Sequence, residues 1–106
     1  MVEGSYQVAN SRNEVRTIGT DSVKISEMLR PGIRQIISLS NRSTAGQTLT
    51  ISIGRPGKDN EGIPLLPGYS WVETEDAKFN VNSDEIWVIS DAIGGTLSIY
   101  ERIKVI

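Results

Sequence analysis

The chain has 106 residues, of which 38% are hydrophobic and 23% charged, and its formal net charge is -2. This length favours one domain with one core, and the charge balance argues against a nucleic-acid partner or an anionic membrane surface. Cysteine and histidine are both absent, which excludes disulfides, thiol catalysis, Ser-His-Asp catalysis and the usual zinc ligands within this chain.

The N-terminal segment, residues 1–13, is mostly polar and carries only Val2, Tyr6 and Val8 as apolar anchors. We expect it to form either an arm or a weak first strand, ahead of a single β-domain over residues 14–106. It lacks the basic and apolar regions of a signal peptide, and no apolar run in the chain is long enough to span a bilayer. These features predict a chain that is made in the cytoplasm.

Two short segments follow. The β-branched residues within Glu14–Gly19 predict a strand, and Val23 with Ile25 begins another. A short helix after Asp21 is the alternative, but Arg30-Pro31-Gly32 would stop it within about two turns. We expect a strand followed by a turn.

The middle of the chain shows the clearest alternation. Ile33, Gln35, Ile37 and Leu39 alternate with polar or outward residues, and a second alternating segment runs over residues 48–53. A polar six-residue turn separates the two segments. The pattern predicts a β-hairpin, and inward positions for Ile37 and Leu39.

A long irregular region is expected over Gly54–Gly68, and loops of that length are usually functional or packed on themselves. It ends in the stretch Gly62–Trp71, in which two prolines fix φ and two glycines permit positive φ. We interpret this stretch as a rigid, ordered corner and as the best candidate for a contact loop. It stands between the two halves of the chain.

The second half predicts strands at Ser70–Glu73, at Phe79–Val81 and at Ile86–Ile89, the last being wholly apolar and therefore typical of a central strand. Leu97 and Ile99 are then expected to face one way, and Glu101 is the next position of the same row. The apolar C-terminus, residues 103–106, either completes a sheet or contacts a partner. About eight short strands in all predict an all-β fold: a single antiparallel β-sandwich, jelly roll or small barrel.

Four segments are informative when they are taken together in chain order: Ile37–Asn41, Thr50–Gly54, Gly62–Trp71, and Ile86–Ser90 continuing through Leu97–Glu101. In this order they resemble a small β-domain that recurs in virion proteins of tailed phages. The resemblance implies a viral structural protein, such as a capsid decoration or cement protein or a head-fibre component. It also implies a homo-oligomer, with a trimer favoured, that binds the major capsid protein or another virion protein and resides in the virion.

Candidate contact residues come from the loop, the corner and the C-terminus, because these elements hold exposed apolar or cationic side chains between strands. An alternative hypothesis is a carbohydrate- or receptor-binding module that stacks sugars on Trp71, Trp87 and Tyr100, although aromatic residues in so small a domain more often belong to the core. The contact residues are Arg55, Lys58, Ile63, Leu65, Leu66, Tyr69, Trp71, Val105 and Ile106.

No catalytic, cofactor or metal site is expected. The acidic runs at Asp59–Glu61 and Glu73–Asp76 lack the ordered spacing of a calcium loop. Gly54–Lys58 lacks the ending of a phosphate-binding loop, and no helix pattern follows it. No spacing of carboxylates indicates a glycosidase pair, and we expect a protein that is not an enzyme.

Overall fold

The computed structural model describes residues 8–105, and in this range the chain forms eight strands and no helix. β1 and β8 are the longest strands, with 11 residues each. The strands are β1 (Val8–Ile18), β2 (Val23–Ser26), β3 (Arg34–Asn41), β4 (Leu49–Ile53), β5 (Ile63–Leu65), β6 (Ser70–Thr74), β7 (Ile86–Ser90) and β8 (Gly95–Val105).

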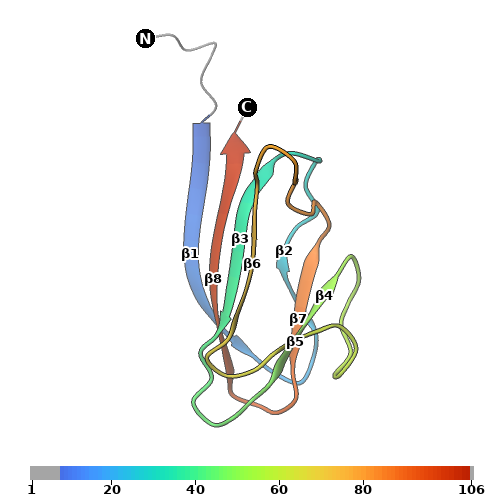
Figure 1. Ribbon diagram of the computed structural model, residues 1–106. Helices are drawn as coiled ribbons and strands as arrows, with labels where there is room; N and C mark the ends of the chain where they lie inside the picture. Colours follow the sequence, from blue (N-terminus) through green and yellow to red (C-terminus); the bar gives the residue numbers. More distant parts are fainter. Residues whose placement is uncertain (1–7, 106) are drawn as a thin grey trace.

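Two four-stranded sheets lie face to face (Figure 1). Sheet A has the order β1-β8-β3-β6, and sheet B has the order β2-β7-β4-β5. All strand pairs are antiparallel. The predicted all-β sandwich is confirmed, and the strand order identifies it as the jelly roll among the three architectures considered.

The core fills the space between the sheets with aliphatic side chains from both inner faces. The alternation of apolar and polar residues along the strands produces this core, because every second residue of a strand points to the same side of the sheet. Ile86–Ile89 lies in β7 at the centre of sheet B, as its apolar run predicted. The fully or nearly fully buried aliphatic residues are Ile18, Ile25, Ile37, Leu39, Leu49, Ile51, Leu65, Val81, Ile86, Val88, Leu97 and Ile99.

The expected hairpin in the middle of the chain is wrong. β3 lies in sheet A between β8 and β6, whereas β4 lies in sheet B between β7 and β5. The polar turn is therefore an arch that carries the chain from one sheet to the other. Both strands have one apolar face, and burying these faces against each other requires them to lie in opposite sheets.

Two further local predictions fail. Within the region expected to be irregular, Ile63–Leu65 forms β5, which pairs with β4 over Leu49–Ile51. Its Pro64 is tolerated because β5 is an edge strand. In contrast, Phe79–Val81 forms no strand; Val81 is only 3% exposed and fills the core from a loop.

A β-bulge changes the predicted inner face of β3. Arg34 pairs with Ile103 and Ile36 with Arg102, so Gln35 is an extra residue without its own partner on β8. The bulge turns Arg34 inward, where its side chain is completely buried. The alternation predicted Gln35 in that inward position, because it assumed an uninterrupted strand.

The N-terminal segment is partly described. β1 begins at Val8 and runs without a break past Asn13, so residues 8–13 belong to the same strand as Glu14–Ile18. The possible arm before Val8 lies outside the described residues. β1 begins, and β8 ends, at the same end of the sandwich (Figure 1).

Candidate functional site

A buried polar network joins the two sheets near the end where β1 starts. Arg34 donates from Nε to Glu101 Oε2 at 2.8 Å and from Nη2 to Ser26 Oγ at 2.7 Å. Ser26 in turn donates to the same Glu101 oxygen. Arg34 also donates to the backbone carbonyls of Glu27, Asn82 and Asp84. All five N–H groups of the guanidinium are therefore satisfied.

Two bulges build this network. The bulge in β3 turns Arg34 inward, and a second irregularity between Lys24 and Ser26 leaves both Ile25 and Ser26 buried in β2. Glu101 continues the inward row of β8 and is 7% exposed. A buried arginine and carboxylate with full hydrogen bonding hold the sheets in one alignment.

The network continues to β1 and closes the outer edge of β2. Arg12 donates from Nε to Glu101 Oε1 at 2.9 Å and from Nη2 to the Ile25 carbonyl. Arg16 donates to the Lys24 carbonyl at 3.1 Å. Because these carbonyls lie on an edge strand, the two arginines occupy acceptors that another strand would need.

Two carboxyl groups of this region have lowered pKa values. For Glu101, burial acts to raise the pKa, but hydrogen bonds from Ser26, Arg34 and Arg12 together with the Arg12 charge outweigh it and lower the pKa below 4.5. For Glu14, the hydrogen bond from Arg16 is the main cause of a pKa below 4.5. Both groups are therefore ionised partners of arginine at neutral pH.

The opposite end of the sandwich is joined by neutral amides. Asn41, which is fully buried, donates from Nδ2 to the carbonyls of Gln47 and Leu65 at 2.8 and 2.7 Å. Gln47 donates to the Ile93 carbonyl at 2.9 Å, and Thr48 N donates to Asp91 Oδ1 at 3.0 Å. These bonds fix the β3–β4 connection to the end of β5 and to the β7–β8 connection.

The corner predicted at Gly62–Trp71 is ordered, as expected. Tyr69 N donates to the Leu66 carbonyl, which closes a four-residue turn with proline second and Gly68 third at φ +83°. Gly68 N donates to the Asn41 carbonyl, and Asn41 N donates to the Tyr69 carbonyl. The corner is thus fastened to the end of β3.

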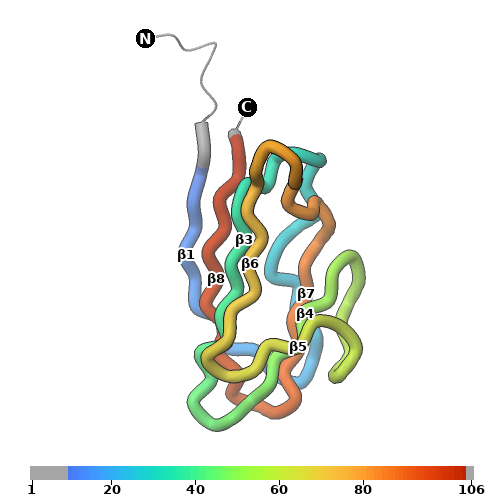
Figure 2. The backbone as a smooth tube through the Cα atoms, viewed as in Figure 1, coloured from blue at the N-terminus to red at the C-terminus, as the bar shows by residue number. Residues whose placement is uncertain are grey.

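Sheet B is covered on its outer face. The loop between β4 and β5 folds back beside this sheet (Figure 2), and Gly57 N donates to Ser22 Oγ at 2.8 Å. A Cβ at Gly57 would lie 3.2 Å from Ser52 Cβ and 3.6 Å from Ile89 Cγ2. Thr50, Ser52 and Ile89 point outward yet are buried, so the loop covers this part of the outer face.

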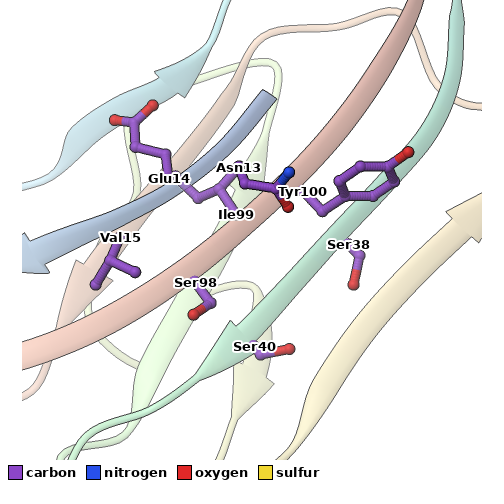
Figure 3. Close-up of a pocket in the computed structure, with 8 residues that line it drawn as sticks. All are labelled: Asn13, Glu14, Val15, Ser38, Ser40, Ser98, Ile99 and Tyr100. Carbon is purple, nitrogen blue, oxygen red and sulfur yellow. The ribbon is translucent and has the colours of Figure 1, made fainter. Parts of the chain in front are cut away.

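Sheet A is open on its outer face. Ser38, Ser40, Ser98 and Tyr100 line a shallow hollow of about 260 Å³ across β3 and β8 (Figure 3). Three of these four side chains are serines, and Val15, which also lines the hollow, is 68% exposed. Within the described residues, no loop covers this face as the β4–β5 loop covers the outer face of sheet B.

The edge strands of the two sheets also differ: those of sheet B are obstructed, and those of sheet A are open. In sheet B, β5 has three residues and includes Pro64, which lacks an N–H, while arginines occupy the carbonyls of β2. In sheet A, β1 pairs only with β8 and β6 pairs only with β3 within residues 8–105. Sheet A therefore ends in two strands that have one unpaired backbone edge each.

The predicted contact residues are spread over several environments. Arg55, Lys58, Leu66 and Tyr69 are exposed. Leu65 is 2% exposed and belongs to the core, so the structure contradicts its assignment as a contact residue. The remaining members are Ile63 and Trp71, which are half-buried against the core, and Val105 and Ile106, of whose side chains the structure says nothing.

The three aromatic residues considered for sugar stacking lie in three separate environments. Trp71 packs against the core from β6. Trp87 lies on the outer face of sheet B, where its Nε1 donates to Glu85 and Lys24 Nζ lies 5.7 Å from its ring centroid. Tyr100 lies on the outer face of sheet A, with its hydroxyl 3.3 Å from Ser11 Oγ. They form no common platform.

Sequence reasoning missed the Arg34 network and the closure of β2. One signal was available: Glu101 follows Leu97 and Ile99 on an inward row, and a carboxylate in such a position needs a cationic partner. In the described part of the chain, no group of three or more acidic, histidine or cysteine side chains is placed to hold a metal. That part also has no helix long and apolar enough to cross a membrane.

No protein-family model matches the chain, and no curated protein matches it in sequence. Among solved structures, it is similar to a chain from Bacillus endospore appendages, described as a novel family of disulfide-linked pili. The identity is 15%, the TM-score is 0.58, and the alignment covers 92% of this chain and 86% of the other. At this identity the similarity shows a shared β-sandwich fold.

Proposed function

We propose that this chain is a non-catalytic structural subunit that associates with copies of itself into a polymer of a surface or extracellular appendage. The observation that carries the proposal is the pair of unpaired edge strands in sheet A, β1 and β6. Unpaired strand edges are templates for pairing with another chain unless they are blocked, and only sheet B is blocked. The fold similarity to a subunit of spore appendages supports the same reading.

Association of this chain does not use disulfide bonds within these 106 residues, because the sequence contains no cysteine. In that respect it differs from the similar pili, which are described as disulfide-linked. Backbone hydrogen bonds between edge strands, with side chains packed across them, supply cohesion without any covalent bond.

The virion role expected from the sequence rests on the resemblance of short segments to phage domains. The solved structure described above, to which the fold is similar, comes from Bacillus endospore appendages. We therefore favour the appendage over the capsid, while self-association, which both readings share, is the part of the proposal that the strand edges support.

Light scattering coupled to size-exclusion chromatography, with electron microscopy of the same sample, tests the proposal. We expect multimers that grow with protein concentration and appear as filaments or rings. A monomer that persists up to millimolar concentration would contradict it. Turnover of a substrate by the purified chain would contradict the non-catalytic part.

A further inference from the structure

We propose that copies of this chain join head to tail through sheet A, with β1 of one copy pairing antiparallel with β6 of the next. The inference rests on the proposed self-association and names its interface. It is built from four observations: which edges are open, how their strands run, which charges they carry, and where apolar side chains are exposed.

The direction of the strands makes this pairing possible without turning a copy over. β1 is antiparallel to β8, β8 to β3, and β3 to β6. Three reversals leave β6 antiparallel to β1. A second copy in the same orientation therefore presents its β1 antiparallel to β6 of the first, and sheet A continues as one antiparallel sheet.

The charges of the two edges are complementary. The inward row of β1 contains Arg12, Glu14 and Arg16, two cations against one anion, whereas β6 contains Glu73 and no cation. Pairing β1 with β6 allows registers in which Arg12 or Arg16 lies opposite Glu73. Pairing β1 with itself about Glu14 would place Arg12 opposite Arg16 and Glu14 opposite Glu14.

The exposed valines of the two edges lie on the same face. Val15 on β1 is 68% exposed and Val72 on β6 is 53% exposed. Val72 pairs with Ser38, which pairs with Tyr100 on the outer face of sheet A, and Val15 borders the same hollow. In both charge-matched registers Val72 faces a residue two positions from Val15, so the two side chains become diagonal neighbours.

Because each contact uses two different surfaces, it is heterologous. One copy keeps a free β6 and the other a free β1, so addition continues into a ring or an open filament and does not stop at a dimer. This consequence separates the proposal from a symmetric contact between two β1 strands or two β6 strands, which would stop at a dimer.

The test uses variants that block one edge at a time. Asn13→Lys with Val15→Lys places two lysines on β1, and Val72→Lys with Thr74→Lys does so on β6. The matched control, Thr96→Lys with Ser98→Lys, adds the same charge at the same spacing on β8, in the interior of sheet A. Mass is measured by sedimentation velocity for each variant alone and for the two edge variants mixed.

We expect each edge variant alone to be monomeric, with association weakened at least about tenfold, which corresponds to about 1.4 kcal/mol. The equimolar mixture should form dimers and nothing larger, because only one intact β1 and one intact β6 remain to pair. The β8 control should assemble as the unmodified chain does.

Other outcomes overturn the proposal in distinguishable ways. Dimers of the β6 variant alone would indicate a β1–β1 contact, and dimers of the β1 variant alone a β6–β6 contact. Full assembly of both variants would place the interface elsewhere and leave the proposed function standing. An unmodified chain that stays monomeric would remove the proposed function itself.

Discussion

Sheet A and sheet B have four strands each, but they differ in how far their outer faces are covered and their edge strands are obstructed. The outer face of sheet B is covered by the β4–β5 loop, and its edge strands carry Pro64 on β5 and arginine-bonded carbonyls on β2. Sheet A has an open outer face, a long edge strand β1 and an unpaired β6. The difference suggests that one sheet is protected against strand addition while the other is available for it.

The largest effect is expected from breaking the network that holds the two sheets together. Arg34→Met leaves Glu101 buried with fewer partners and should cost about 3 to 5 kcal/mol of unfolding free energy. Lys24→Met, which removes a partly exposed ion pair with Glu27, should cost less than about 1 kcal/mol. Urea denaturation in an edge-blocked background measures both, since assembly does not contribute there. Equal losses would show that the network does not anchor the sheets.

A smaller loss of unfolding free energy is expected from alanine substitutions at two glycines of the corner region, and the two losses should differ in size. A Cβ at Gly62, where φ is +152°, would overlap the Ile51 carbonyl oxygen of β4, so Gly62→Ala should cost about 2 to 4 kcal/mol. Gly68 has φ +83° but open space around it, so Gly68→Ala should cost about 1 to 2 kcal/mol. Thermal unfolding of the two variants compares them. A larger loss for Gly68→Ala would contradict the close contact between β5 and β4.

Acid should weaken the network selectively. The folded pKa of Glu101 is lowered below its ordinary 4.5, so its contribution is full above the unfolded pKa and is lost as pH falls through the folded pKa. Stability should therefore decline below about pH 4.5. Glu101→Gln should lower stability at neutral pH and flatten this decline. A pH profile that stays parallel to that of the unmodified chain would show that Glu101 is not the titrating group.

The smallest effect on stability, but an informative one, concerns the closed edge of sheet B. Arg16→Met frees the Lys24 carbonyl and should cost about 0.5 to 1.5 kcal/mol. With both edges of sheet A blocked by lysines, it should restore weak association through β2. Arg102→Met, at an exposed position of the interior strand β8, is the control and should not. Light scattering detects the difference, and no association in either variant would show that arginine does not protect this edge.

Much of the fold was predictable from local patterns. Alternation located the inward rows of Ile37 with Leu39 and of Leu97 with Ile99, and the apolar run at Ile86–Ile89 predicted a central strand. The rigidity of the corner followed from proline and glycine chemistry. These features depend on residues close together in the chain.

The wrong predictions concern features that depend on contacts between segments far apart in the chain. Alternation cannot distinguish a hairpin from an arch, so β3 and β4 were wrongly paired. A bulge at Gln35 shifts the inward row by one residue, which hid Arg34 and its partner Glu101 from the prediction. The candidate edges β1 and β6 become visible only once the strand order is known.

Engineered cysteines test the head-to-tail contact most directly, because the sequence contains no native cysteine. In the two charge-matched registers Val72 faces either Asn13 or Thr17, at a spacing that a disulfide can bridge. We predict that Val72→Cys combined with one of Asn13→Cys or Thr17→Cys gives, on mild oxidation, a ladder of covalent multimers on a non-reducing gel. Each single variant should stay uncrosslinked. Dimers from a single variant, or no ladder from either pair in assembled protein, would contradict pairing of β1 with β6.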